Sequence, residues 1–149
     1  MFPPEAGGPQ RVATAFFLHS MIMPAITPAS LHFWRINAEW PQMSVQFSLP
    51  GSGSVWGMIA TLAWIPLLTL GILAMFTIRR FREFRWMVGL TLLGQLLLRT
   101  VYGEETFLYG LHVVPLLILT AALSTLTAMR RPALILTGLL TLTGAVNNG

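Results

Sequence analysis

From residue 55 onward, long apolar runs alternate with short charged or Pro- and Gly-rich segments. The first run covers residues 55–78 and is long enough to cross a hydrocarbon layer of roughly 30 Å as a helix. Three further apolar runs follow, over residues 86–98, 107–129 and 133–146. The first of these three extends to Tyr102 if the Arg99 side chain reaches back to the membrane surface. The pattern predicts an all-α membrane protein with about four transmembrane helices.

The connections between the apolar runs carry most of the charge. Arginines are concentrated at Arg79–Arg85 and at Arg130–Arg131, each beside a long apolar run. Cytoplasmic loops of membrane proteins are enriched in Lys and Arg, and two predicted spans separate the two arginine segments. Both segments are therefore predicted to be cytoplasmic in a bacterial inner membrane. The N-terminal 54 residues, residues 99–106 and the C-terminus are then external.

The N-terminal part has a different pattern, and the chain divides into an outer-surface or interfacial segment at 1–54 and a transmembrane bundle at 55–149. Val12–Thr27 is mostly apolar but short for a span, so it predicts an interfacial or re-entrant helix, with a fifth transmembrane helix as the alternative. Trp34 and Trp40 suit a membrane–water interface. Ser44–Leu49 alternates polar and apolar residues and predicts a short strand.

Composition supports the membrane assignment. Hydrophobic residues make up 54% of the chain and charged residues only 9%, whereas a soluble domain carries roughly 25% charged residues. All nine cations are Arg, but their placement beside apolar runs indicates membrane topology, so no nucleic-acid partner is expected. The chain has no Cys, which excludes disulfides and thiolate chemistry.

One polar cluster is a candidate binding site. It lies at a predicted membrane boundary and consists of Arg99, Tyr102, Glu105, Tyr109 and His112. Ionisable groups near a bilayer are costly and are functional candidates for that reason. Glu105, Tyr109 and His112 share one face if the helix already begins near Glu105. Such a face can serve a proton relay or contact a polyprenyl phosphate.

Structural explanations of the same residues remain open. Glu104 and Glu105 can favour the positive end of a helix dipole, the tyrosines can belong to an aromatic belt, and Arg99 can snorkel or pair with a glutamate. No metal site is predicted, because no second pair of strong ligands is visible. Catalytic residues stay unknown, and the common nucleotide-binding, zinc-protease and serine-hydrolase motifs are absent from the sequence.

The run YGEETFLYGLHVVPLL and the following span resemble the C-terminal region of bacterial polytopic membrane proteins of the GT-C glycosyltransferase type and their uncharacterised relatives. That region often ends with a Tyr-Gly-x-Glu-x-Phe-Leu-Tyr-x-x-His-x-x-Pro stretch, a further span and an Asn pair. The matching positions are Tyr102, Gly103, Glu105, Phe107, Leu108, Tyr109, His112, Pro115, Asn147 and Asn148. Such enzymes have many more spans and an acidic base in the first outer loop.

The resemblance therefore implies a glycosyltransferase-like tail that is not catalytic alone. It implies a unit that binds a lipid-linked substrate, such as a polyprenyl phosphate, or an accessory subunit with a protein partner in a larger membrane assembly. The alternative from another class is a structural subunit of a pigment, quinone or haem complex, in which His112 or His19 binds a tetrapyrrole. No particular cofactor follows from the sequence.

Overall fold

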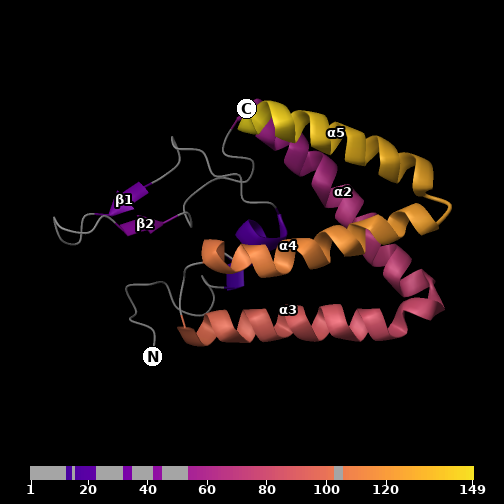
Figure 1. The fold of residues 1–149 in the computed structure, drawn as a ribbon, viewed down its shortest axis with the longest axis horizontal. Coiled ribbons are helices and arrows are strands. Elements are labelled where there is room, and N and C mark those ends of the chain that lie inside the picture. Colours follow the sequence, from indigo (N-terminus) through magenta and orange to yellow (C-terminus); the bar gives the residue numbers. More distant parts are fainter. Residues whose placement is uncertain (1–12, 15, 23–31, 35–41, 45–53, 103–105) are drawn as a thin grey trace.

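A computed structural model shows a mainly helical chain whose four long helices run back and forth along one axis (Figure 1). It describes residues 13–14, 16–22, 32–34, 42–44, 54–102 and 106–149. The helices are α2 (Val55–Thr77), α3 (Arg82–Tyr102), α4 (Thr106–Ala122) and α5 (Arg130–Asn148). Short 3-10 segments connect them, η5 (Arg79–Phe81) before α3 and η6 (Leu123–Leu126) before α5.

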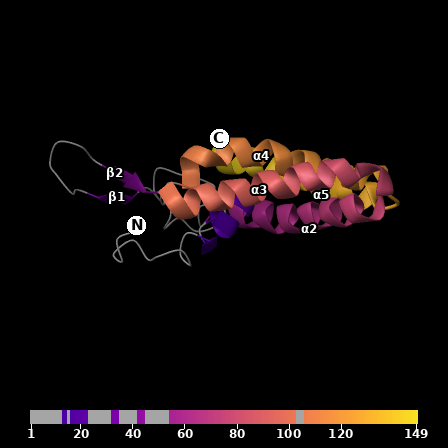
Figure 2. The same cartoon turned by 90° about the horizontal axis from the view of Figure 1, so that it is seen from below.

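The helix α2 is the centre of the bundle. It runs diagonally from the C-terminal end of α5 to the start of α3 and crosses α4 (Figure 1). Seen from below, α4 and α2 appear on opposite sides of α3 (Figure 2). Its buried positions repeat every three or four residues, as expected for one face of a helix. Trp64, Leu67 and Leu68 of α2 join one apolar cluster with residues of the two neighbouring helices: Val113, Leu117, Ala121 and Ala133.

A glycine allows the backbones of α2 and α4 to approach closely. A Cβ atom added at Gly71 would lie 2.3 Å from the carbonyl oxygen of Thr120 and 2.5 Å from the Cα atom of Ala121. Only glycine fits there without a shift of the backbone. Small residues at helix crossings have this role in both soluble and membrane bundles.

The described part of the N-terminal segment is short. A single π-helical turn, η2 (Phe16–Met21), lies against α4 and buries Phe16. The indole Nε1–H of Trp64 donates a 2.8 Å hydrogen bond to the carbonyl oxygen of Met21, which attaches this turn to α2. The predicted helix over 12–27 is therefore represented by residues 13–14 and 16–21, and residues 12, 15 and 23–27 lie outside the described part.

The predicted strand at Ser44–Leu49 meets the described residues at Ser44 alone, which is the last residue of an observed strand. The structure has an antiparallel hairpin of β1 (His32–Trp34) and β2 (Gln42–Ser44), with Phe33 opposite Met43. Residues 45–49 lie outside the described part. Strand ends depend on the paired strand, which a local alternation of polar and apolar residues does not identify. The hairpin lies beyond the end of the bundle where α3 ends and α4 begins (Figure 1).

Helix ends differ from the predictions in ways that local chemistry explains. The predicted span over 107–129 ends as an α-helix at Ala122, because hydroxyls of the following residues bond to nearby carbonyls. Ser124 Oγ donates to Ala121 O at 2.6 Å, and Thr125 Oγ1 donates to Ala122 O at 2.7 Å. Such local bonds compete with the α-helical ladder. Pro132 is the third residue of α5 and not the first as predicted. Proline is tolerated there as well, because the first backbone N–H groups of a helix have no partner within the helix.

Among the described helices, α2 alone combines the length and the apolar composition needed to cross a membrane, and half of its most apolar stretch is buried inside the bundle. The segment His112–Leu126 is a shorter apolar helix. The helix α3 carries four charged residues, and α5 begins with two arginines and ends with two asparagines. These polar ends lower the mean hydropathy of both helices.

Candidate functional site

The predicted polar cluster lies where α3 passes into α4. Arg99 and Tyr102 are on the last turn of α3, and Tyr109 and His112 are on the first two turns of α4. Three residues connect the two helices, so these positions gather at one end of the bundle (Figure 1). Glu105, like Glu104, lies outside the described residues. The structure thus brings together the helix ends that carry four of the five candidates.

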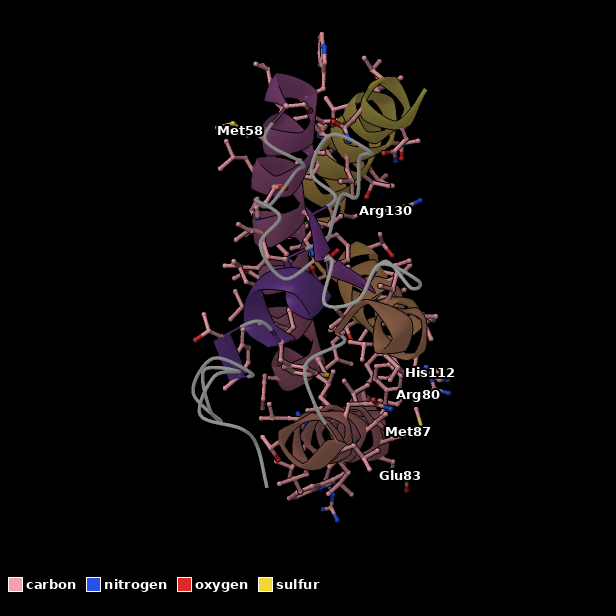
Figure 3. All side chains as sticks on the ribbon, turned by 90° about the vertical axis from the view of Figure 1, so that its left-hand side faces the viewer. Met58, Arg80, Glu83, Met87, His112 and Arg130 are labelled. Atoms are coloured by element: carbon pink, nitrogen blue, oxygen red, sulfur yellow. The ribbon has the colours of Figure 1, made fainter. Side chains whose placement is uncertain are left out.

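His112 is the one candidate whose side chain the structure describes. It is exposed and points away from the bundle on α4 (Figure 3). The side chains of Arg99, Tyr102 and Tyr109 lie outside the described part of the chain, so their ion pairs and contacts stay predictions. An exposed imidazole is available to a ligand or a partner.

Metal-binding side chains do not gather in the part of the chain that the structure describes. No group of three His, Cys, Asp or Glu residues there could hold a metal ion. His19 and His32 belong to η2 and β1, and their side chains are outside the described part.

Charge is concentrated at the opposite end of the bundle. The connection from α2 to α3 and the connection from η6 to α5 both lie there (Figure 1). They carry Arg79–Arg85 and Arg130–Arg131. The two arginine segments are far apart in sequence, yet the fold places them at one end. This arrangement agrees with the predicted topology, in which both segments face the same side.

Arg85 holds the end of α2 against the start of α3. Its Nη1 donates hydrogen bonds to the carbonyl oxygens of Met75 at 3.1 Å and Phe76 at 3.3 Å. Its Cζ lies 5.5 Å from the centre of the Phe76 ring. The last four carbonyls of a helix have no partner within the helix, and a cation at this end also interacts favourably with the helix dipole. Sequence analysis assigned Arg85 to topology alone and missed this contact.

A cavity of about 200 Å³, partly open to the outside of the bundle, lies between α2, α3 and α4, with Met21 of η2 also on its wall. Its wall is apolar apart from Arg85 and Thr120. Thr120 directs its hydroxyl to the Leu116 carbonyl at 2.8 Å, so this group is already satisfied within α4. Arg85 therefore supplies the only charge on the described wall. The cavity cannot be predicted from the sequence, because its wall residues run from Met21 to Thr120 and so come from several separate segments.

A polar contact closes the end of the bundle at the start of α2. Ser54 Oγ accepts a 2.8 Å hydrogen bond from the Gly57 backbone N–H and so caps α2. The same hydroxyl donates to Asn147 Oδ1 on the last turn of α5. A serine before an apolar run is a recognisable cap signal. Its partner 93 residues away is not recognisable from sequence.

Gln95 is an uncharged polar residue in the apolar stretch of α3. It is half-buried on α3, and its Oε1 has no hydrogen-bond partner among the described residues. The described contacts therefore give no support to a bridging role.

Comparison with known proteins adds no relative: no family model, no curated protein and no solved structure matches the chain. The similarity to the glycosyltransferase type stays a prediction from the motif residues Tyr102 to Pro115 and the final Asn pair.

Proposed function

We propose that this chain is a multi-pass protein of the bacterial inner membrane that acts as an accessory subunit of a larger membrane assembly. One observation carries the proposal: large apolar side chains are exposed along all four long helices. Met58 on α2 and Met87 on α3 point outward from the bundle (Figure 3), and Leu142 on α5 is also exposed. Exposed apolar side chains in such numbers indicate contact with lipid or with another protein.

The distribution of charge supports the same proposal. In the bundle, charged residues occur only at 79–85, 99–105 and 130–131, which are the ends of helices. The 23 residues of α2 extend about 34 Å, enough for a hydrocarbon layer of roughly 30 Å. The uncharged stretch of α3 from Trp86 to Leu98 extends about 20 Å. Arg99 at one end then extends toward the interface, as long basic side chains do, while Arg85 at the other end bonds to the last turn of α2.

The polar end at the α3–α4 connection is the proposed contact for a ligand. His112 is exposed there, and the motif shared with glycosyltransferase-like proteins covers the same segment. A lipid-linked substrate, such as a polyprenyl phosphate, would approach this end from the outer membrane surface. The chain supplies lipid or partner contacts in this proposal, and a larger assembly supplies the chemistry.

Orientation gives the first test. The chain has no cysteine, so single substitutions report without a background. Ala128→Cys places an exposed thiol in the turn at the arginine end without removing an arginine, and Asn148→Cys places one at the other end. We expect a membrane-impermeant maleimide to label Asn148→Cys in intact cells and Ala128→Cys only after permeabilisation. Labelling of Ala128→Cys alone in intact cells would overturn the topology, and release of the protein by alkaline carbonate would overturn the membrane location.

A second test addresses the assembly. Protein purified in mild detergent is expected to be colourless and to retain a partner subunit or polyprenyl lipid, detected by mass spectrometry. A Soret or bacteriochlorophyll absorbance band would instead assign the chain to a haem or pigment complex. The His112→Ala variant then shows whether the imidazole binds that tetrapyrrole.

A further inference from the structure

The cavity between α2, α3 and α4 has the dimensions of a small ligand site. Its volume is about 200 Å³, and an apolar protein cavity of about 150 Å³ already binds benzene. Leu68 and Ile72 of α2, Val88 and Leu92 of α3 and Leu117 of α4 form part of its wall. This part of the wall offers no polar partner to ordered water. An apolar chain is therefore the preferred occupant.

The cavity is bordered on α3 by an exposed glycine, Gly89. A Cβ added there would meet no atom within 4 Å. Gly71 on α2 shows the opposite arrangement, since α4 lies directly on it. The bundle therefore leaves space beside Gly89 of α3, whereas it leaves none beside Gly71 of α2.

Arg85 places a positive charge at the wall of this apolar space. Among the described residues, Nη1 is the nitrogen that donates to the carbonyls of Met75 and Phe76, while a guanidinium carries five N–H donors in all. Arg82, one helical turn earlier on α3, is exposed, and no ion pair joins Arg85 to Glu83 among the described residues. Guanidinium groups bind phosphate oxygens with two parallel hydrogen bonds where the geometry allows.

Together these features fit an amphiphile with an apolar chain and an anionic head. We propose that the cavity binds one acyl chain of an anionic glycerophospholipid, whose phosphate contacts Arg85 and Arg82. This inference rests on the proposed membrane location with the arginine end in the cytoplasm. The cytoplasmic leaflet holds anionic lipids that attract basic segments near the membrane surface. Charge complementarity selects this occupant, since the segment 79–85 has four arginines and one glutamate.

The test measures lipid retention by the full chain in detergent, using native mass spectrometry with added dioleoyl phosphatidylglycerol or dioleoyl phosphatidylcholine. The two lipids share their acyl chains and differ in net charge. We expect the wild type to retain phosphatidylglycerol about tenfold more strongly, the scale of one charge-assisted contact. Equal retention of the two lipids would overturn the proposal.

Gly89→Leu tests the proposed site of the acyl chain, and Arg85→Gln tests the proposed site of the phosphate head group. Gly89→Leu fills the cavity and should abolish specific retention, whereas Gly94→Leu lies on the same helix in open space away from the described wall. Arg85→Gln should remove the preference for phosphatidylglycerol, and Arg130→Gln removes an exposed charge at the same end without touching the cavity. Arg85→Lys keeps the charge but lacks the planar fork, so intermediate retention is expected.

The melting temperature of each variant is measured as a control for folding, because Arg85→Gln also removes the contact with the end of α2. Gly89→Leu leaves that contact in place, so the proposal is decided even if Arg85→Gln does not fold. Equal phosphatidylglycerol retention by Gly89→Leu and Gly94→Leu would refute the cavity as the site. Displacement of phosphatidylglycerol by an equimolar amount of undecaprenyl phosphate would assign the cavity to a prenyl lipid instead. The cysteine labelling pattern is independent of all these outcomes, so it shows separately whether the proposed membrane topology has failed.

Discussion

The helices α2 and α3 both contain a long uncharged apolar stretch but are packed very differently. Ten of the 23 residues of α2 are buried, in a stripe that faces α4 and α5. On α3, Val88 is the only buried side chain among those that the structure describes. Trp64 on α2 is 5% exposed, and Trp86 on α3 is 65% exposed. Apolar sequence therefore marks a helix that avoids water without telling whether protein or lipid surrounds it.

The difference begins with small residues that have opposite surroundings. Gly71 is in backbone contact with α4, while Gly89 and Gly94 on α3 face open space. Close approach at Gly71 brings many side chains into contact, and it accounts for the dense packing around α2. The helix α3 is attached mainly through Arg85 at one end and the short connection to α4 at the other. An outer helix of this kind is suited to contact lipid or a partner.

The largest effect is expected for alanine at the two contrasting glycines. Gly71→Ala forces a Cβ atom against the backbone of α4 and should lower the free energy of unfolding by about 3 kcal/mol. Gly89→Ala has free space and should leave stability unchanged or raise it by about 0.5–1 kcal/mol through helix propensity. Unfolding by SDS in mixed micelles, followed by circular dichroism, measures both. Equal losses would show that α3 is packed as closely as α2.

Trp64 on α2 and Trp86 on α3 test the same difference in packing, with a smaller expected effect on stability than the glycines. Trp64→Phe keeps a buried ring but removes the hydrogen bond to the Met21 carbonyl, which should cost about 2 kcal/mol. Trp86→Phe on the exposed face of α3 is the matched control and should not change stability in micelles. The same SDS titration applies. A loss at position 86 that equals the loss at position 64 would contradict an outward-facing α3.

A third pair tests the contact between the ends of α2 and α5. Ser54→Ala removes the cap of α2 and the link to Asn147, and a lost N-cap costs about 1 kcal/mol. Thr91→Ala on α3 removes only a bond to the Met87 carbonyl within the same helix and should be neutral. Thermal unfolding in detergent distinguishes the two. No change in the Ser54 variant would mean that solvent or lipid replaces the cap.

The smallest effect on stability is expected at His112, which is exposed on α4. His112→Ala should change the melting temperature by no more than an ordinary surface substitution does, within about 0.5 kcal/mol. Loss of a lipid or partner subunit at unchanged stability would support the proposed ligand contact. A large stability loss with normal ligand retention would assign His112 a structural role. Glu105→Gln, which keeps the shape and removes the charge, extends the same measurement to the neighbouring connection.

The sequence predicted the helices more closely than it predicted their ends and contacts. The first span was expected at 55–78 and is observed at Val55–Thr77, because Ser54 and the arginines after Ile78 mark its limits. The end of α4 was wrong because hydroxyls near Ser124 draw the chain into a 3-10 turn. Within the candidate site, the position of His112 near the connection of α3 and α4 could be predicted from the pattern of apolar and polar residues. Its exposure depends on which neighbours pack against α4.

By itself, the sequence determined where the apolar helices lie and which connections carry the arginines, because periodicity and charge are local properties of the chain. Tertiary structure decided which apolar face is buried, since the close approach at Gly71 depends on Thr120 and Ala121 about 50 residues away. It also decided that Arg85 would border an apolar cavity. A cavity is a volume left between several helices, and its size depends on their mutual positions rather than on any one segment.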